Sequence, residues 1–284
     1  MSHLGGTPHP YRRRCAALAT RHGKLPLIAP AMHEFIGLDV VAVAVDTDSL
    51  GTFSGEVERA GSSWDAAVAK ARLGMSASGM PLGIASEGSF APYAPAPFVL
   101  AETELVVLVD DDLGITIGES ETAFSPPTVR LEIEPGALDL AALDRGGFPE
   151  HGLIVRPEDG VSPIVKGVHD IAELDRAIAR CASASDTGRA IVESDLRAHH
   201  HPFRRDVIAR AAGRLARRLA STCPMCGIPG WGATDHEPGA PCALCHQPTW
   251  TTLADIWGCA GCRHSVRIER SEWADPAQCT LCNP

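Results

Sequence analysis

Hydrophobic and polar positions follow two rhythms between residues 12 and 220. Short runs rich in Val, Ile, Leu and Ala predict strands, and longer stretches whose apolar residues return every three or four positions predict helices. The expected strands are 15–20, 39–45, 82–85, 98–109, 115–119, 129–133, 153–155 and 190–192. The expected helices are 64–77, 137–144, 171–182 and 202–220. Because the two kinds of segment alternate, the pattern predicts an α/β fold.

The first expected helix has a clear beginning. Ser62 and Asp65 have the spacing of a capping box, in which each side chain bonds a free backbone N–H of the first turn. Ala67, Ala71 and Met75 then recur on one face. We therefore expect this helix to pack on the sheet through that face.

Composition and charge narrow the class of protein. The chain has 284 residues, 45% of them hydrophobic, and a formal net charge of −10. No apolar run approaches the roughly 18 residues that suggest a membrane span, and residues 1–11 lack the apolar core of a secretory signal. We therefore expect a flexible lead-in over 1–11, no membrane partner and a cytoplasmic location. The negative charge argues against non-specific binding to nucleic acid.

Ten cysteines are distributed unevenly. Cys15 and Cys181 stand alone beside apolar residues and are expected to be buried thiols. The other eight form four Cys-x-x-Cys motifs, which are Cys223 and Cys226, Cys242 and Cys245, Cys259 and Cys262, and Cys279 and Cys282. Paired thiols in a reducing compartment are typical of metal ligands, and two such motifs complete a four-sulfur zinc site.

The spacing of these motifs predicts two structural zinc ions in a double zinc ribbon over residues 221–284. The gaps between motifs are 15, 13 and 16 residues. Pairing the first with the second and the third with the fourth gives two consecutive ribbons of ordinary size. An interleaved pairing stays open.

The sequence predicts the metal of this module more clearly than it predicts the function of the module. Residues 222–284 carry six acidic side chains and three arginines, and each four-thiolate site adds negative charge. The ribbons alone are therefore not expected to bind nucleic acid. They fit a stabilising cap, or a docking surface for another protein or a second copy of the chain. Exposed tryptophans would serve docking, and the candidates are Trp231, Trp250, Trp257 and Trp273. A ribbon-centred function with the body as scaffold also stays open.

Several segments of the body carry candidate chemistry. Ala19-Thr20-Arg21-His22-Gly23-Lys24 follows the first expected strand, and Gly55-Glu56-Val57-Glu58 precedes a helix that contains Lys70. A later strand ends in Ala85-Ser86-Glu87-Gly88, and Arg197-Ala198-His199-His200-His201-Pro202 precedes an arginine-rich helix. In this order the segments resemble the inosine triphosphatase-like pyrophosphatases, including their inosine/xanthosine triphosphatase branch, which remove non-standard purine nucleotides. The whole chain also resembles a bacterial family of unknown function with a C-terminal double zinc ribbon.

The resemblance implies a mixed-sheet α/β body over residues 12–220 and a fold like that of inosine triphosphatase. It also implies a metal-dependent hydrolase of nucleoside triphosphates that uses Mg²⁺ or Mn²⁺. Two positions depart from that family's pattern, because His22 replaces an asparagine and Ser86 replaces the first of two carboxylates. The alternative is a protein that binds a nucleotide or RNA without catalysis.

Each candidate residue has an expected role. Glu87 with Glu56 or Glu58 would hold the divalent ion, since Mg²⁺ prefers one or two carboxylates. Lys70 would neutralise phosphate charge close to them. The expected substrate-binding residues are Thr20, His22, Lys24, Arg197, His199, His200 and Arg204. The first three leave a strand end, where backbone amides and an ammonium reach phosphate.

Overall fold

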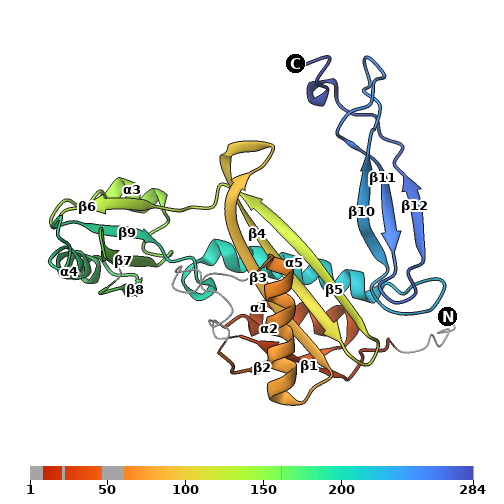
Figure 1. The fold of residues 1–284 in the computed structure, drawn as a ribbon, viewed down its shortest axis with the longest axis horizontal. Coiled ribbons are helices and arrows are strands. Elements are labelled where there is room, and N and C mark those ends of the chain that lie inside the picture. Colours follow the sequence, from red (N-terminus) through yellow and green to blue (C-terminus); the bar gives the residue numbers. More distant parts are fainter. Residues whose placement is uncertain (1–8, 21–22, 47–60, 161, 284) are drawn as a thin grey trace, which may run out of the picture.

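The protein is described by a computed structural model over residues 9–20, 23–46, 61–160 and 162–283. Three parts are visible in Figure 1, namely a central five-stranded sheet with helices, a smaller four-stranded sheet and a three-stranded ribbon. None of the helices in this described part has the length and apolar composition that crossing a bilayer requires. The chain is thus a mixed α/β protein with a separate C-terminal module.

The central sheet has the strand order β2-β1-β3-β4-β5. Its strands are β1 (Cys15–Ala19), β2 (Asp39–Val43), β3 (Leu82–Tyr93), β4 (Ala96–Asp110) and β5 (Ile115–Phe124). β1 runs parallel to β2 and β3, whereas β3, β4 and β5 are antiparallel to one another in turn. The expected mixed sheet is therefore confirmed.

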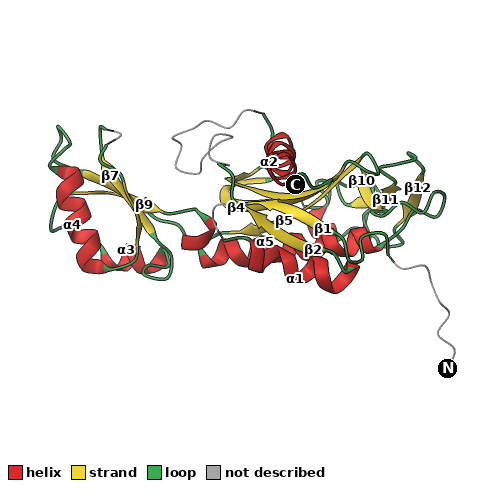
Figure 2. Ribbon diagram, turned by 90° about the horizontal axis from the view of Figure 1, so that it is seen from below, coloured by secondary structure: helices red, strands yellow, loops and turns green. Residues whose placement is uncertain are grey.

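Three helices cover the two faces of this sheet, as Figure 2 shows edge-on. They are α1 (Leu25–Ile36), α2 (Ser63–Ser78) and α5 (Pro202–Ala220). Successive strand residues point to opposite faces, so β4 supplies Val106 to the core under α1 and α5 and Val107 to the core under α2. The capping box at the start of α2 forms as expected.

Residues between β5 and α5 form a second sheet with its own hydrophobic core. Its strands are β6 (Arg130–Ile133), β7 (Leu153–Pro157), β8 (Val165–Val168) and β9 (Ala190–Ser194), in the order β6-β9-β7-β8. The helices α3 (Leu140–Arg145) and α4 (Ile171–Ala182) accompany it. Figure 1 shows this unit at the far side of the molecule from the ribbon. The stretch expected to form one α/β domain over 12–220 thus holds two sheets with separate cores.

The C-terminal ribbon consists of β10 (Gly232–Pro238), β11 (Thr252–Gly258) and β12 (Ser265–Glu269). Both strand pairs are antiparallel. In the view of Figure 1, one end of this ribbon lies beside the central sheet and the other end points away from it. Two short 3-10 turns complete the described structure, η2 (Ala198–His200) before α5 and η3 (Pro276–Gln278) near the end.

Several sequence expectations differ from the structure at identifiable points. The helix α1 was not expected, because Pro30 inside it removes one backbone hydrogen bond and is typical of a helix end. The strand β3 continues well beyond Ala85, through polar residues that pair with β4. Cys181 is buried as expected, but Cys15 is exposed, so that expectation was wrong. Cys15 is the first residue of β1, and the buried part of the strand begins only after it.

Candidate functional site

Eight cysteines of the ribbon form two clusters suited to zinc. In each cluster the four sulfur atoms lie within 4.8 Å of one another. Close pairs are separated by 3.7 Å (Cys223 and Cys262) and 3.6 Å (Cys245 and Cys279). A tetrahedral zinc ion with Zn–S bonds of about 2.3 Å requires sulfur separations of about 3.8 Å. A disulfide requires about 2.05 Å, so the four-sulfur donor set fits a metal ion.

The motifs pair in the interleaved order. The first and third motifs form a four-cysteine cluster beside the central sheet, and the second and fourth form another at the free end. We name them the proximal and the distal zinc site after the metal that they fit. The proximal ligands are Cys223, Cys226, Cys259 and Cys262, and the distal ligands are Cys242, Cys245, Cys279 and Cys282. The consecutive pairing set out above was therefore wrong. Its physical reason is the antiparallel pairing of β10 and β11, which places Gly232 opposite Gly258 and so brings the flanking motifs to one end.

The two zinc sites are built on an internal repeat. The pattern Cys-x-x-Cys-x-x-Pro-x-Trp occurs at residues 223–231 and again at 242–250. The repeat is structural too, because Thr222 bridges Pro229 and Pro241 bridges Pro248 in the same antiparallel manner. This signal was present in the sequence and was missed.

The proximal end of the ribbon is fixed to the body. Ile228 packs against the core beneath α1 and α5, and Arg218 of α5 donates from Nε to the carbonyl of Gly230 at 3.1 Å. A Cβ at Gly230 would lie only 2.0 Å from Cδ1 of Ile117, so glycine alone allows this approach. The ribbon is thereby anchored to both α5 and β5.

A second candidate site lies in the body, where β1 ends beside β3. Lys24 follows β1, and its Nζ donates to Oγ of Ser86 at 2.8 Å. On the other side of the sheet, Nζ of Lys70 from α2 lies 2.5 Å from Oε2 of Glu87, with side chains only 12% and 4% exposed. β1 pairs with β3 only at Ala17 and Leu18, so Ser86 and Glu87 lie just past its last paired residue. The two pairs therefore flank the carboxyl end of β1 from opposite faces of the sheet, and the charges of Glu87 and Lys70 act on Lys24. Strand ends of this kind are where α/β sheets bind ligands.

The neighbouring strand β4 adds charges that sequence reasoning missed. Arg204 of α5 forms a short ion pair with Glu104, and its Nε lies 3.9 Å from Glu102. All three side chains are almost completely buried. A Cβ at Gly88, which pairs with Glu104 across the strands, would lie 2.4 Å from Oε1 of Glu104. Glutamates two positions apart on an apolar strand were the available signal, since such spacing puts both on one buried face.

Burial shifts the ionisation of this charge cluster. Burial and then repulsion from Arg204 lower the pKa of Lys24 to about 8. Burial and then the charge of Glu104 raise the pKa of Glu102 to about 8. In the described part of the chain, no donor reaches either carboxylate oxygen of Glu102. Buried groups with shifted pKa values and unsatisfied polar atoms are typical of binding and catalytic sites.

The structure separates the sequence candidates into two groups. Lys24, Lys70, Glu87 and Arg204 belong to the buried charge cluster, defined as these residues with Ser86, Glu102 and Glu104. Thr20 follows β1, and its N–H donates to the carbonyl of Val43 at 3.5 Å. Three other candidates, His22, Glu56 and Glu58, lie outside the described residues.

The remaining candidates lie at the junction with the second sheet. Arg197 donates from Nε to Oδ1 of Asp195 at 2.9 Å. Burial opposes ionisation of Asp195, but hydrogen bonds from Arg197 hold its pKa below the ordinary value. Nδ1 of His200 lies 2.8 Å from Nε2 of His169, and burial lowers the pKa of His200 to about 4. Burial also lowers the pKa of His199, whose ring centre lies 4.0 Å from that of His200.

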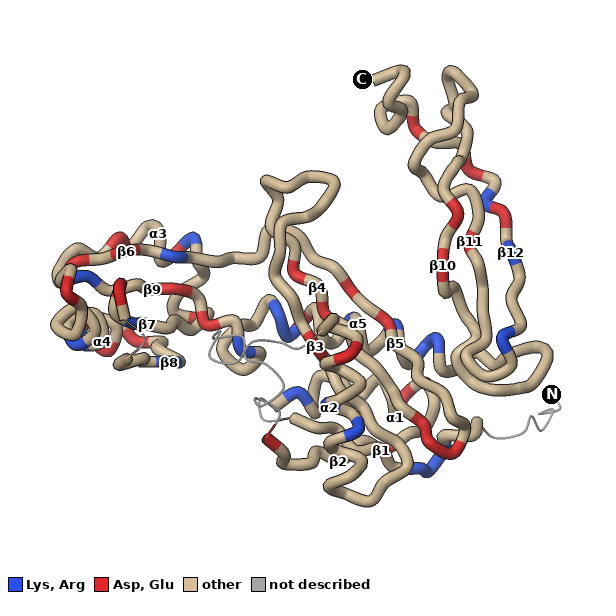
Figure 3. Tube along the Cα trace, in the orientation of Figure 1, with Lys and Arg blue, Asp and Glu red and all other residues tan. Residues whose placement is uncertain are grey.

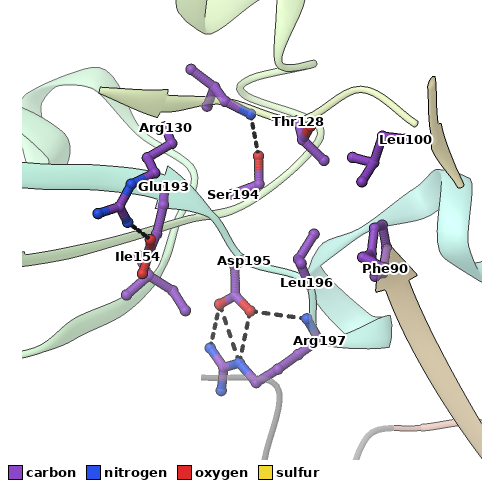
Figure 4. A pocket seen from close by; sticks show the side chains of 11 residues that line it. Phe90, Leu100, Thr128, Arg130, Ile154, Glu193, Ser194, Asp195, Leu196 and Arg197 are labelled. Atoms are coloured by element: carbon purple, nitrogen blue, oxygen red, sulfur yellow. Dashed lines mark hydrogen bonds and ion pairs between the residues drawn. The ribbon is translucent and has the colours of Figure 1, made fainter. Parts of the chain in front are cut away.

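A cavity of about 250 Å³ adjoins this second group (Figure 4). Its wall includes Phe90 and Leu100 from the central sheet and Arg130, Asp195 and Arg197 from the second unit. It also borders the charge cluster, since Phe90 pairs with Glu102 across the strands and Arg204 donates to the carbonyl of Leu196. The cavity and the charge cluster are thus neighbours.

Comparison with known families bears on both sites. The profile of a domain of unknown function, DUF6671, matches residues 70–284. The chain belongs to this family. The expected membership of a family of unknown function is thereby confirmed. No curated protein matches the chain.

The DUF6671 match spans most of the chemistry described above. It runs from Lys70 through Glu87, Glu104 and Arg204 and includes both zinc sites. The family match therefore joins the zinc ribbon to the part of the body from Lys70 onward, while β1, α1, β2 and Lys24 precede it.

Proposed function

We propose that the body is a metal-dependent hydrolase of nucleoside triphosphates, including non-standard purine nucleotides, that carries a double zinc ribbon. The observation that supports this most is that Lys24, Lys70 and Glu87 lie around the carboxyl end of β1, within electrostatic reach of one another. Two ammonium groups and a carboxylate are what a triphosphate and its metal ion require. The sequence resemblance to inosine triphosphatase-like enzymes, which implies a fold like theirs, supports the same proposal.

Phosphate binding is assigned to the two lysines. Lys24 is half-buried, and desolvation lowers the pKa of its ammonium, so an arriving phosphate stabilises the charged form. Lys70 is held by Glu87 in the absence of ligand. A phosphate oxygen that binds the Lys70 ammonium would replace Glu87 in this ion pair, and the Glu87 carboxylate could then bind the metal ion or orient the attacking water. Substrate binding and exposure of the catalytic group are then coupled.

The metal ion is assigned to Glu87, which lies beside the carboxyl end of β1. Carboxylate oxygens are the protein ligands that Mg²⁺ and Mn²⁺ prefer, so this donor fits a hard cation. Glu102 and Glu104 lie on the opposite face of the sheet, against Arg204 of α5, and are not assigned to the same ion. When bound, the ion would neutralise phosphate charge and lower the pKa of a water molecule.

The base and sugar are assigned to the cavity at the sheet junction. It adjoins the charge cluster, is lined by Phe90 and Leu100 on its apolar side and carries Arg197 on its polar side. His199 and His200 follow Arg197 in η2 but are not among the residues that line this cavity, and His200 lies against His169. The polar contact to the nucleotide is therefore assigned to Arg197.

A second candidate function is nucleotide or RNA binding without catalysis. It is favoured by the ion pairs of the charge cluster, where Lys70 neutralises Glu87 and Arg204 neutralises Glu104. Carboxylates held in this way bind a metal ion only if those pairs open. A protein that has lost chemistry would keep them closed.

The two candidates are separated by turnover. The zinc-loaded full chain is incubated with inosine, xanthosine and standard nucleoside triphosphates in Mg²⁺ or Mn²⁺, and released phosphate and pyrophosphate are measured. Glu87→Gln should reduce turnover by about 10²–10⁴-fold while nucleotide binding persists. Lys24→Ala should mainly raise KM. Glu134→Gln, at a carboxylate 71% exposed on the second sheet, is the matched control.

Each outcome has a distinct meaning. Metal-dependent turnover that Glu87→Gln abolishes supports the hydrolase. Nucleotide binding without turnover in the unaltered protein supports the second candidate. Absence of nucleotide binding would reject both.

A further inference from the structure

The distal end of the ribbon exposes large apolar side chains. Trp250 is 82% exposed and Trp273 is 54% exposed, while Leu244 and Leu281, at the tips of two zinc-binding turns, are 67% and 69% exposed. All four come from the segments that build the distal zinc site. Clustered exposed hydrophobic residues on a soluble protein mark interaction surfaces.

The two copies of the internal repeat allow the distal end of the ribbon to be compared with the proximal end, which packs against the body. The residues Pro229, Gly230 and Trp231 at the proximal end correspond to Pro248, Thr249 and Trp250 at the distal end. Pro229 and Gly230 are buried against the body, whereas Pro248 is exposed. The Pro-x-Trp part of the repeat is therefore covered at one end of the ribbon and uncovered at the other, whereas Met225 and its counterpart Leu244 are exposed at both ends.

The charge of the module selects the kind of partner. Figure 3 shows acidic residues along the ribbon, and Arg267 and Arg270 are already paired with its carboxylates. Glu272 and Asp275 flank Trp273, and the nearest basic residue of the segment, Arg270, is paired with Asp255. A four-thiolate zinc site adds further negative charge. At the proximal end, the covering element is the arginine-rich helix α5, whose Arg218 contacts the ribbon backbone. An apolar, negatively charged surface is complementary to a basic segment.

A hollow beside Trp250 offers room for a side chain. It measures about 290 Å³ and is lined by Pro238, Pro248, Trp250 and Gln278, among others. Thr249 stands where the proximal end has Gly230, the glycine that allows close contact with the body. A partner at the distal end must therefore cover the hollow without touching the backbone at this position. Aromatic and proline walls suit the aliphatic stem of an arginine.

We propose that the distal end of the ribbon is a docking surface for a basic, arginine-bearing helix of a partner protein. Trp250 is the central contact, and Leu244, Leu281 and Trp273 are further exposed apolar side chains of the same end. The zinc module then joins the body to a second protein, with one zinc site facing each.

The test uses a helix that this fold already accepts as its probe. A fluorescein-labelled peptide with the sequence of residues 202–220 is titrated with the zinc-loaded full chain, and binding is followed by anisotropy. Trp250→Ala should weaken binding at least about tenfold, as loss of a central aromatic contact does. Phe98→Ala, at an aromatic residue 91% exposed on the β3–β4 hairpin, is the matched control and should change affinity less than about twofold.

Charge is tested with the same peptide. Replacing its arginines with glutamine should abolish binding, and added salt should weaken binding of the original peptide. Both protein variants must retain the zinc content of the unaltered chain.

Four outcomes would overturn the proposal. They are no binding of the peptide, binding that Trp250→Ala leaves unchanged, a Trp250-dependent dimer in sedimentation without peptide, and Trp250-dependent binding of single-stranded RNA. The third would assign the surface to a second copy of the chain, and the fourth to nucleic acid.

Discussion

Glu102 lies on β4 with its side chain fully buried and its pKa raised to about 8 by burial and then by Glu104. An unfolded glutamate has a pKa near 4.5, so between these values the folded state holds a proton that the unfolded state has released. This contribution to stability is therefore greatest at low pH and is lost progressively as the pH rises towards 8.

Glu102→Gln removes this ionisation while keeping the shape of the side chain. Relative to the unaltered protein, the variant should gain thermal stability as the pH rises from 4.5 to about 8, and the difference should then level off. Thermal unfolding measured from pH 4.5 to 9 tests this, with Glu134→Gln as the exposed control. Parallel pH profiles for all three proteins would show that Glu102 ionises normally.

Lys24 gives a second pH dependence, which rests on the proposed binding of phosphate. Its pKa is lowered to about 8, first by burial and then by Arg204, so its ammonium loses its proton as the pH passes through this value. Affinity for a nucleoside triphosphate should fall between pH 7 and 9, by at most about tenfold per pH unit.

Calorimetric titration at the two pH values checks this dependence. Lys24→Gln should bind weakly at both pH values, whereas Lys166→Gln on the second sheet should keep the fall. A fall that persists in Lys24→Gln would assign the titration to another group.

At the residue scale, the sequence identified the cysteines and the candidate residues Lys24, Lys70 and Glu87, but not the buried glutamates near them. The cysteines were identifiable because their spacing is local. Lys24, Lys70 and Glu87 stood in motifs at strand and helix ends. Glu102 and Glu104 could not be placed, because their burial depends on Arg204, which lies 100 residues further along the chain than Glu104.

At the scale of single elements, replacing two glycines with alanine should change the free energy of unfolding in opposite directions. Gly88 on β3 leaves space for the ion pair of Glu104 and Arg204, since a Cβ there would meet these side chains at 2.4 and 2.6 Å. Gly88→Ala should lower the free energy of unfolding by about 1–3 kcal/mol through overpacking.

Gly213 lies inside α5, where a Cβ would meet nothing closer than Nη1 of Arg217 at 3.4 Å. Gly213→Ala should raise the free energy of unfolding by about 0.5–1 kcal/mol, because alanine loses less entropy in a helix. Urea unfolding of both variants provides the measurement. If both substitutions changed the free energy of unfolding by the same amount and in the same direction, the contacts around Gly88 would not explain why glycine stands there.

The elements that sequence patterns predicted correctly are those with a local signature. The helices α4 and α5 have the expected bounds, since their apolar residues repeat without a break. The strand β8 was not expected, because its four residues, Val165–Val168, include a lysine and a glycine and pair only with β7.

At the scale of the whole molecule, the pairing of the zinc motifs has a direct test. Serine at both the first and third motifs removes only the proximal site, so metal analysis should find one zinc ion per chain in place of two. Serine at both the first and second motifs leaves two ligands in each site and should leave almost no bound zinc. A consecutive arrangement would give the reverse result.

The sequence predicted part of the overall architecture. The α/β class and the separate zinc module follow from composition and periodicity over short windows. Which strands share a sheet depends on pairing between distant residues, and the chain leaves the central sheet after β5 and returns to it only at α5. The second sheet and the interleaved zinc sites share this non-local origin.

Interleaving also sets an order of events during synthesis. The first and second motifs leave the ribosome before Cys259 and Cys262 exist, so four thiolates are together with no correct partner. A zinc ion bound by all four of these cysteines would join Cys223 and Cys226 to Cys242 and Cys245, and it would have to be released before the two native ligand sets could form. Zinc supplied late in translation should therefore yield more native protein than zinc supplied early, and exchange of the metal, more than growth of the strands, would limit the maturation of the ribbon.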